Sequence, residues 1–254
     1  MECTALHTRI MKVTLEVDAA REYWRRRALK GPPSASEAFD GFWFGTKSLS
    51  RVKELLTALR ARYEGSGDSM AVLGHWQRMT PDTRTLVCHW HTQLSDPLYR
   101  RFTGDWLPEL RNHGRDAVTH PRAVEWVGQQ APGRWSLATQ RQLASKLLTA
   151  AREARLLDGR QDPRTLLVPT VEPDALTYLL YLLRSIDHEG ELFDNAYLRS
   201  VGLEGFLLTD RLRQLPALEL HQQLDIVDAH WAFDGLGEWA HHSVAPDLPR
   251  DTTR

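Results

Sequence analysis

Residues 135–171 read WSLATQRQLASKLLTAAREARLLDGRQDPRTLLVPTV and combine a long amphipathic helix with a short β-branched tail. The apolar residues of the helix recur at steps of three and four: Leu143, Leu147, Ala150, Ala154 and Leu157. This spacing places them on one helix face, which must pack against another element. Ser136 stands where an N-cap residue would accept a hydrogen bond from the first turn.

The end of this helix is followed by turn and strand signals. Asp158-Gly159 tolerates positive φ, and the run from Pro163 to Val171 has β-branched residues closed by Pro169 and Pro173. A helix, a turn and a small hairpin in this order predict a winged helix-turn-helix.

The chain has 254 residues, which is long enough to bury a sizeable core. The sequence predicts a mostly α protein, in which helical bundle lobes flank a winged helix-turn-helix element carrying a small β-hairpin. We expect an N-terminal helical lobe at 1–120, the winged module at 121–171, a C-terminal helical lobe at 172–244 and a flexible tail at 245–254.

The formal charge of −1 conceals an uneven distribution of charged residues. Residues 1–120 carry 18 Lys and Arg against 14 Asp and Glu, residues 121–171 carry 8 against 4, and residues 172–254 carry 6 against 15. The middle segment attracts a polyanion and the last third repels one. Any nucleic-acid contact is therefore expected in the first two thirds of the chain.

Two cysteines, Cys3 and Cys88, are too few for a disulfide framework and fit a reducing compartment. The longest apolar run, around Leu176 to Leu183, is too short to cross a bilayer. These features predict a cytoplasmic protein without a membrane partner.

A second amphipathic helix is predicted at 48–63. Its inward face is predicted to hold Val52, Leu55, Leu56 and Leu59, and its outward face Arg51, Lys53, Arg60 and Arg62. Residues 8–16 alternate loosely, as a strand would. The basic run at 18–30 fits either a phosphate-contacting arm or a solvated helix face.

Motifs for catalysis or metal binding are missing from the sequence. Gly45-Thr46-Lys47-Ser48 lacks the glycine spacing of a phosphate-binding loop. Cys88, His89 and His91 are metal-capable side chains, but neighbours on a helix point in different directions. No nucleophile elbow, zinc-protease, dinucleotide or kinase signature occurs. We therefore expect no enzyme activity, no metal and no cofactor.

Four stretches resemble the BrxA proteins of BREX (bacteriophage exclusion) phage-defence systems. They are GTKSLSRVKELLTALRARY, DPLYRRFTGDWL, WSLATQRQLASKLLTAAREARLL, and YLRSVGLEGFLLTDRLRQL followed by LDIVDAHWAF. The resemblance implies a small, mostly helical DNA-binding accessory protein that acts beside a methyltransferase, an ATPase and a phosphatase-like partner. It implies no catalysis.

Our prediction is that the helix from Ser136 to Leu157 contacts duplex DNA. The predicted DNA-binding residues are Thr139, Gln140, Arg141, Gln142, Ser145, Lys146, Arg160, Arg164, Lys47 and Arg51. Thr139, Gln140 and Gln142 are the candidates for base edges, and the arginines and lysines for phosphate. The alternative is an interaction adaptor that docks other defence components or regulates the defence operon, with the acidic last third contacting a basic partner.

Overall fold

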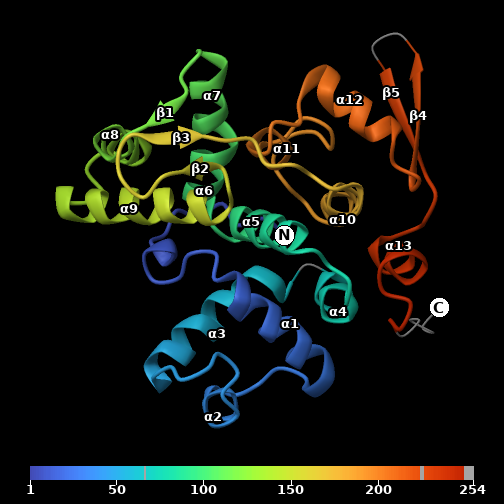
Figure 1. The fold of residues 1–254 in the computed structure, drawn as a ribbon, viewed down its shortest axis with the longest axis horizontal. Helices are drawn as coiled ribbons and strands as arrows, with labels where there is room; N and C mark the ends of the chain where they lie inside the picture. The colour runs from blue at the N-terminus through green and yellow to red at the C-terminus, as the bar shows by residue number, and fades with distance from the viewer. Residues whose placement is uncertain (66, 224–225, 249–254) are drawn as a thin grey trace.

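The computed structural model describes residues 1–65, 67–223 and 226–248, which form packed helices with two small antiparallel sheets (Figure 1). Helices hold most of the described residues and strands a small share, which confirms the predicted mostly α class. None of the helices among the described residues has the length and apolarity needed to span a membrane.

The first half of the chain is a set of helices joined by short loops. These are α1 (Val17–Lys30), α2 (Ala35–Asp40), α3 (Leu49–Tyr63), α4 (Ser69–His75), α5 (Pro81–Ser95), α6 (Pro97–Arg101), the π-helical turn η2 (Phe102–Trp106) and α7 (Leu107–Asn112). Local sequence sets several starts, because Ser34, Ser48 and Thr80 each accept a hydrogen bond from the first turn that follows. In α3 the four predicted apolar residues are buried, whereas Arg62, predicted to face outward, is also buried and donates to the carbonyls of Val13 and Leu15.

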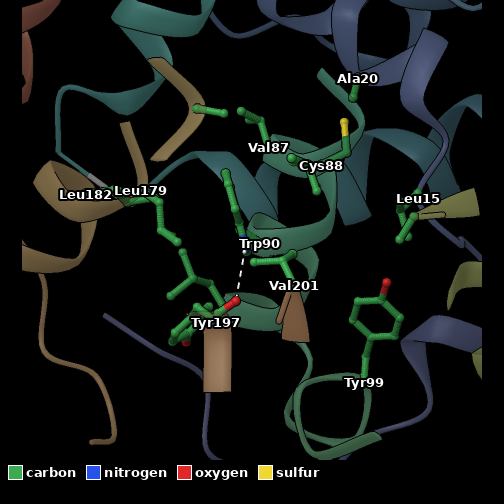
Figure 2. Close-up of a cluster of buried hydrophobic side chains, with 14 of the residues drawn as sticks. Leu15, Ala20, Val87, Cys88, Trp90, Tyr99, Leu179, Leu182, Tyr197 and Val201 are labelled. Atoms are coloured by element: carbon green, nitrogen blue, oxygen red, sulfur yellow. Dashed lines mark hydrogen bonds between the residues drawn. The ribbon is translucent and has the colours of Figure 1, made fainter. Parts of the chain in front are cut away.

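Helix α5 lies in the middle of the molecule. It packs against α1, α3, α6 and α10 (Pro173–Arg184), so it is enclosed on several sides. Figure 2 shows the apolar cluster around it, with the Trp90 indole N–H donating to the carbonyl of Tyr197 at 3.3 Å. One connected apolar core joins the described parts of the chain.

Two imidazoles of α5, His89 and His91, are completely buried. The His91 Nδ1 lies 2.9 Å from the carbonyl of Arg62 and therefore carries the proton, so its Nε2 accepts from the Tyr178 hydroxyl at 2.7 Å. The His89 Nε2 lies 2.9 Å from the Ser200 hydroxyl, which itself donates to the carbonyl of Tyr197. The His89 Nε2 is thus the donor. Both rings are held in the neutral form, and burial lowers the pKa of His89 to about 3 and of His91 to about 4.

The N-terminal segment 2–15 is bound along the body of the protein. Glu2 is buried and forms an ion pair with Arg100 at 2.7 Å, and its backbone N–H donates to Asp187. Further along, the Leu15 N–H donates to the Glu153 carboxylate at 3.0 Å. The strand predicted at 8–16 is wrong: the segment holds a 3-10 turn, η1 (Arg9–Met11), because its polar backbone groups bond to side chains and loops rather than to a neighbouring strand.

The last third contains α10, α11 (Ala196–Ser200), α12 (Gly205–Arg213), β4 (Leu218–Gln223), β5 (Ile226–Trp231) and α13 (Leu236–Ser243). Strands β4 and β5 pair antiparallel, Leu218 opposite Trp231, in a hairpin that sequence analysis missed. Of the predicted flexible tail, residues 249–254 lie outside the described residues, while Ala245 and Leu248 are buried.

The neutral imidazoles make stability dependent on pH. Between the unfolded pKa near 6.5 and the lowered folded pKa values the unfolded chain binds more protons, so stability falls as pH falls. At pH 5 we expect a loss of about 2 kcal/mol per ring relative to pH 7.5. Urea denaturation of the wild type and of His91→Gln at both pH values measures this change in unfolding free energy. The control is His113→Gln, which replaces an exposed histidine. Equal pH slopes for wild type and His91→Gln would contradict this assignment.

The Glu2–Arg100 pair should also be costly to break. Its side chains are 3% and 5% exposed, so Arg100→Met strands a buried carboxylate, and we expect a loss of about 3–5 kcal/mol in unfolding free energy. The exposed pair between Arg25 and Glu22 supplies the contrast, since solvent screens this pair and Arg25→Met should lower the unfolding free energy far less than Arg100→Met does. Denaturant titration of both variants at pH 7.5 compares them.

Candidate nucleic-acid interface

The segment from 107 to 166 contains a helix pair backed by a three-stranded sheet. Helix α7 leads into β1 (Ala117–Val118), α8 (His120–Gln130), α9 (Leu137–Glu153), β2 (Leu157–Asp158) and β3 (Arg164–Leu166). The strands run antiparallel in the order β1-β3-β2, with Ala117 opposite Thr165 and Asp158 opposite Thr165 on its other side. Strand β1 lies on the N-terminal side of the boundary predicted at residue 120, yet it pairs with β3.

Helix α9 packs on α8 with the apolar face that its sequence predicts (Figure 1). Leu143, Leu147 and Ala150 of α9 are buried as predicted, but the helix ends at Glu153 and not at the predicted Leu157. Ala154 caps the helix, Arg155 adopts a positive φ of 59° that breaks it, and the buried Leu157 lies in β2. Ser136 caps the helix by accepting from the Thr139 N–H, and Gly159 adopts φ +91° in the turn after β2. At its other end Glu153 holds the N-terminal segment. The helix is therefore fixed at both ends and along one face.

The opposite face of α9 is open. Arg141 and Gln142 are exposed and Lys146 is half-buried, and their side chains make no hydrogen bond or ion pair within the described part of the chain. Arg141 and Lys146 lie five residues apart, and Gln142 lies one turn from Lys146 on the helix. At about 100° per residue, Arg141 and Lys146 lie about 140° apart around the helix axis, so the two cations flank Gln142 on opposite edges of the open face.

Three other predicted residues of α9 are engaged within the protein. The Thr139 hydroxyl bonds the Ser136 hydroxyl at 3.1 Å. The Gln140 amide donates to the Trp135 carbonyl at 3.0 Å, and its side chain lies beside Gly128 of α8. Ser145 donates to the Arg141 carbonyl at 2.9 Å. Gln140 is directed toward α8 and not toward the open face.

The loop at 159–163, between β2 and β3, carries Arg160, and Arg164 is the first residue of β3. Arg160 is exposed, and its side chain makes no hydrogen bond or ion pair with the described residues. Arg164 is half-buried and forms an ion pair with Asp162 at 2.6 Å. Only Arg160 of this pair is free to meet an external anion.

Lys47 and Arg51 are not brought to this face. Lys47 is exposed in the loop before α3, and Arg51 on α3 bonds the Lys12 carbonyl at 2.6 Å and pairs with Glu16 and Glu54. Figure 1 shows α3 in a separate part of the molecule from α8 and α9. The basic run of α1 is likewise neutralised in part, because Arg25 and Arg26 pair with Glu22 and Arg27 pairs with Glu64.

The contact between the 159–163 loop and the start of α8 leaves no signal in the sequence. Asp162 accepts from the His120 backbone N–H at 2.7 Å, although Thr119 occupies the N-cap position and forms no cap bond of its own. The His120 Nε2 in turn lies 2.9 Å from the Ser145 hydroxyl of α9. Pro121, in the first turn, signals a helix start. Only the fold shows that the acceptor for the His120 N–H is Asp162, 42 residues away.

The metal-capable side chains of α5, Cys88, His89 and His91, are buried in the protein core. No group of three or more such residues among those described is arranged to hold a metal ion. The Cys88 thiol is buried and accepts from the Tyr63 hydroxyl, and burial raises its pKa to about 12. A thiol with so high a pKa is a poor nucleophile at neutral pH.

No family model matches the chain, and no curated protein matches it. A solved structure does: the crystal structure of an uncharacterized protein from Magnetospirillum magneticum, with a TM-score of 0.58 and 13% sequence identity. The match covers 78% of this chain and 98% of that chain. At this identity the similarity shows a shared fold.

The Asp162 contact can be tested by mutation. Asp162→Ala removes the acceptor for His120 and the partner of Arg164, so we expect about 1 kcal/mol lower stability and faster amide hydrogen exchange at 159–166 and His120. The control is Asp158→Ala, because the Asp158 carboxylate bonds only its neighbour Gly159 among the described residues. Hydrogen exchange that is unchanged in Asp162→Ala would contradict the role.

Proposed function

We propose that this chain binds duplex DNA through a winged helix-turn-helix, with α9 as the helix that enters the major groove and the 159–163 loop as the wing. The order of elements, in which β1 precedes the helix pair and the β2–β3 hairpin follows it, supports this assignment. In helix-turn-helix proteins the second helix of the pair contacts base edges. Here that helix is α9.

The open face of α9 carries the proposal. Arg141, Gln142 and Lys146 are unpaired on a helix whose other face is buried, so they are available to a ligand at no cost in internal contacts. Residues 121–171 carry a net charge of +4, which favours a polyanion. Arg160 extends the positive surface into the wing.

The chemistry of this face favours phosphate over base contacts. Arg141, Lys146 and Arg160 supply charge, which contributes affinity independent of sequence. Gln142 is the exposed amide that reaches a base edge, since the amide of Gln140 is bonded to Trp135. We therefore infer strong salt dependence and modest sequence preference.

The resemblance to BrxA proteins supports the same function and extends it. In this proposal the protein is a non-enzymatic accessory factor of a BREX-type defence system and works beside a methyltransferase, an ATPase and a phosphatase-like protein. Copurification of these partners from cells at high salt tests that association independently of DNA binding.

The DNA contact is tested by fluorescence anisotropy with a labelled generic duplex at several salt concentrations. Each phosphate contact contributes about 0.9 to the slope of log K against log salt. We therefore expect Arg141→Glu/Lys146→Glu to weaken binding at low salt by at least about tenfold and to reduce the slope by about two.

The control is Lys53→Glu, a single charge reversal at an exposed lysine on α3 away from the interface. It should change the affinity by less than about twofold. Unchanged binding by the double variant, or equal weakening by Lys53→Glu, would refute α9 as the contact helix. Absence of duplex binding by the wild type would refute the function.

A further inference from the structure

A hollow of about 480 Å³ opens on a part of the surface that the proposed DNA contact does not use. One wall comes from the η2–α7 segment and α8, and the other from residues 189–196 with Arg199 of α11. None of its lining residues belongs to α9 or to the 159–163 loop. A ligand there would not compete for the α9 face.

Two tryptophans form the aromatic part of this hollow. The rings of Trp106 and Trp126 are stacked, with centroids 5.3 Å apart and planes at 25°, and Phe102 packs against both at 5.1 and 5.3 Å. Trp126 is 8% exposed and Trp106 is half-buried, so the pair is held by the core while lining an opening. Tryptophan is the aromatic side chain that attracts a cation most strongly.

Charge around the rings is unevenly neutralised. Arg199 pairs with Asp105 at 2.9 Å and Asp194 at 2.8 Å. The Arg100 guanidinium is used by Glu2. The positive charges of Arg199 and Arg100 are therefore already neutralised, and they do not offset the other acidic side chains that line the hollow.

Three lining carboxylates stay unpaired within the described part of the chain: Glu109, Glu189 and Glu191. They are exposed, and Arg101 is the lining cation without an ion pair among the described residues. The excess of negative charge repels phosphate, which excludes a nucleotide or the DNA backbone as a favoured occupant. It attracts a cation.

We propose that this hollow binds arginine side chains from a basic segment of a partner protein. A guanidinium is planar, stacks on an indole face and presents paired N–H donors that match a carboxylate, whereas an ammonium lacks both features. The half-buried ring of Trp106, backed by Trp126, and the unpaired carboxylates of Glu189 and Glu191 supply both kinds of contact. The site thus adds a protein-docking function that is independent of the duplex contact.

The probe is a fluorescein-labelled peptide of alternating glycine and arginine, titrated into the full chain and followed by anisotropy. We expect Glu189→Lys/Glu191→Lys to weaken binding by at least about tenfold, because the variant replaces two carboxylates that attract the arginines of the peptide with two lysines that repel them. The control, Asp116→Lys/Glu125→Lys, makes the same change in net charge at exposed residues outside the hollow and should alter binding by less than about twofold.

A second set of measurements separates arginine recognition from a general attraction of polycations. A peptide with lysine in place of arginine should bind at least about fivefold more weakly. Trp106→Leu, checked for folding by circular dichroism, should weaken the arginine peptide, whereas Arg141→Glu/Lys146→Glu should leave it unchanged. The proposal is overturned if the arginine peptide does not bind, if both charge variants weaken it equally, or if the lysine peptide and spermidine compete as well as the arginine peptide.

Discussion

The burial of polar side chains on α5 is the constraint on which the rest of the structure depends. Because α5 is enclosed by α1, α3, α6 and α10, its two imidazoles are shielded from solvent and must find their hydrogen-bond partners within the protein. Each nitrogen of His89 and His91 therefore needs a partner from a different part of the chain, and Tyr99, Ser200, Tyr178 and the Arg62 carbonyl supply them. Because these partners come from α3, α6, α10 and α11, the network fixes their mutual positions more specifically than apolar contact alone does.

Polar contacts between distant segments also hold the surface that is proposed to bind DNA. Glu153, at the end of α9, is bonded to the segment that Arg62 also holds, so α9 is connected to the α5 core through polar contacts. Asp162 fastens the wing loop to α8. A contact surface built this way is largely ordered before its ligand arrives, which lowers the entropy cost of binding.

Local patterns in the sequence predicted part of this arrangement. The stripes of α3 and α9, the cap at Ser136 and the turn at Gly159 follow from spacing and residue type, and the structure confirms them. Strand β1 has two residues and no periodicity to detect, and its identity depends on β3, 46 residues later. The pairing of Arg51 and Arg62 was also beyond local pattern, because their long-range partners lie 35 to 49 residues earlier in the chain, whereas Arg164 pairs with Asp162 only two residues away. For the site, sequence indicated the helix and its charge, but not which of its side chains are free.

The N-terminal segment has a consequence for how the protein matures on the ribosome. Glu2 is held by Arg100, Asp187 and Tyr197, and the last of these is synthesised 195 residues after it. The segment therefore stays undocked while most of the chain is made. Closing so long a loop is also slow compared with forming local helices. The residues of this segment are thus made before most of the chain and are among the last to reach their native contacts, and the interval exposes core surface that a chaperone can recognise.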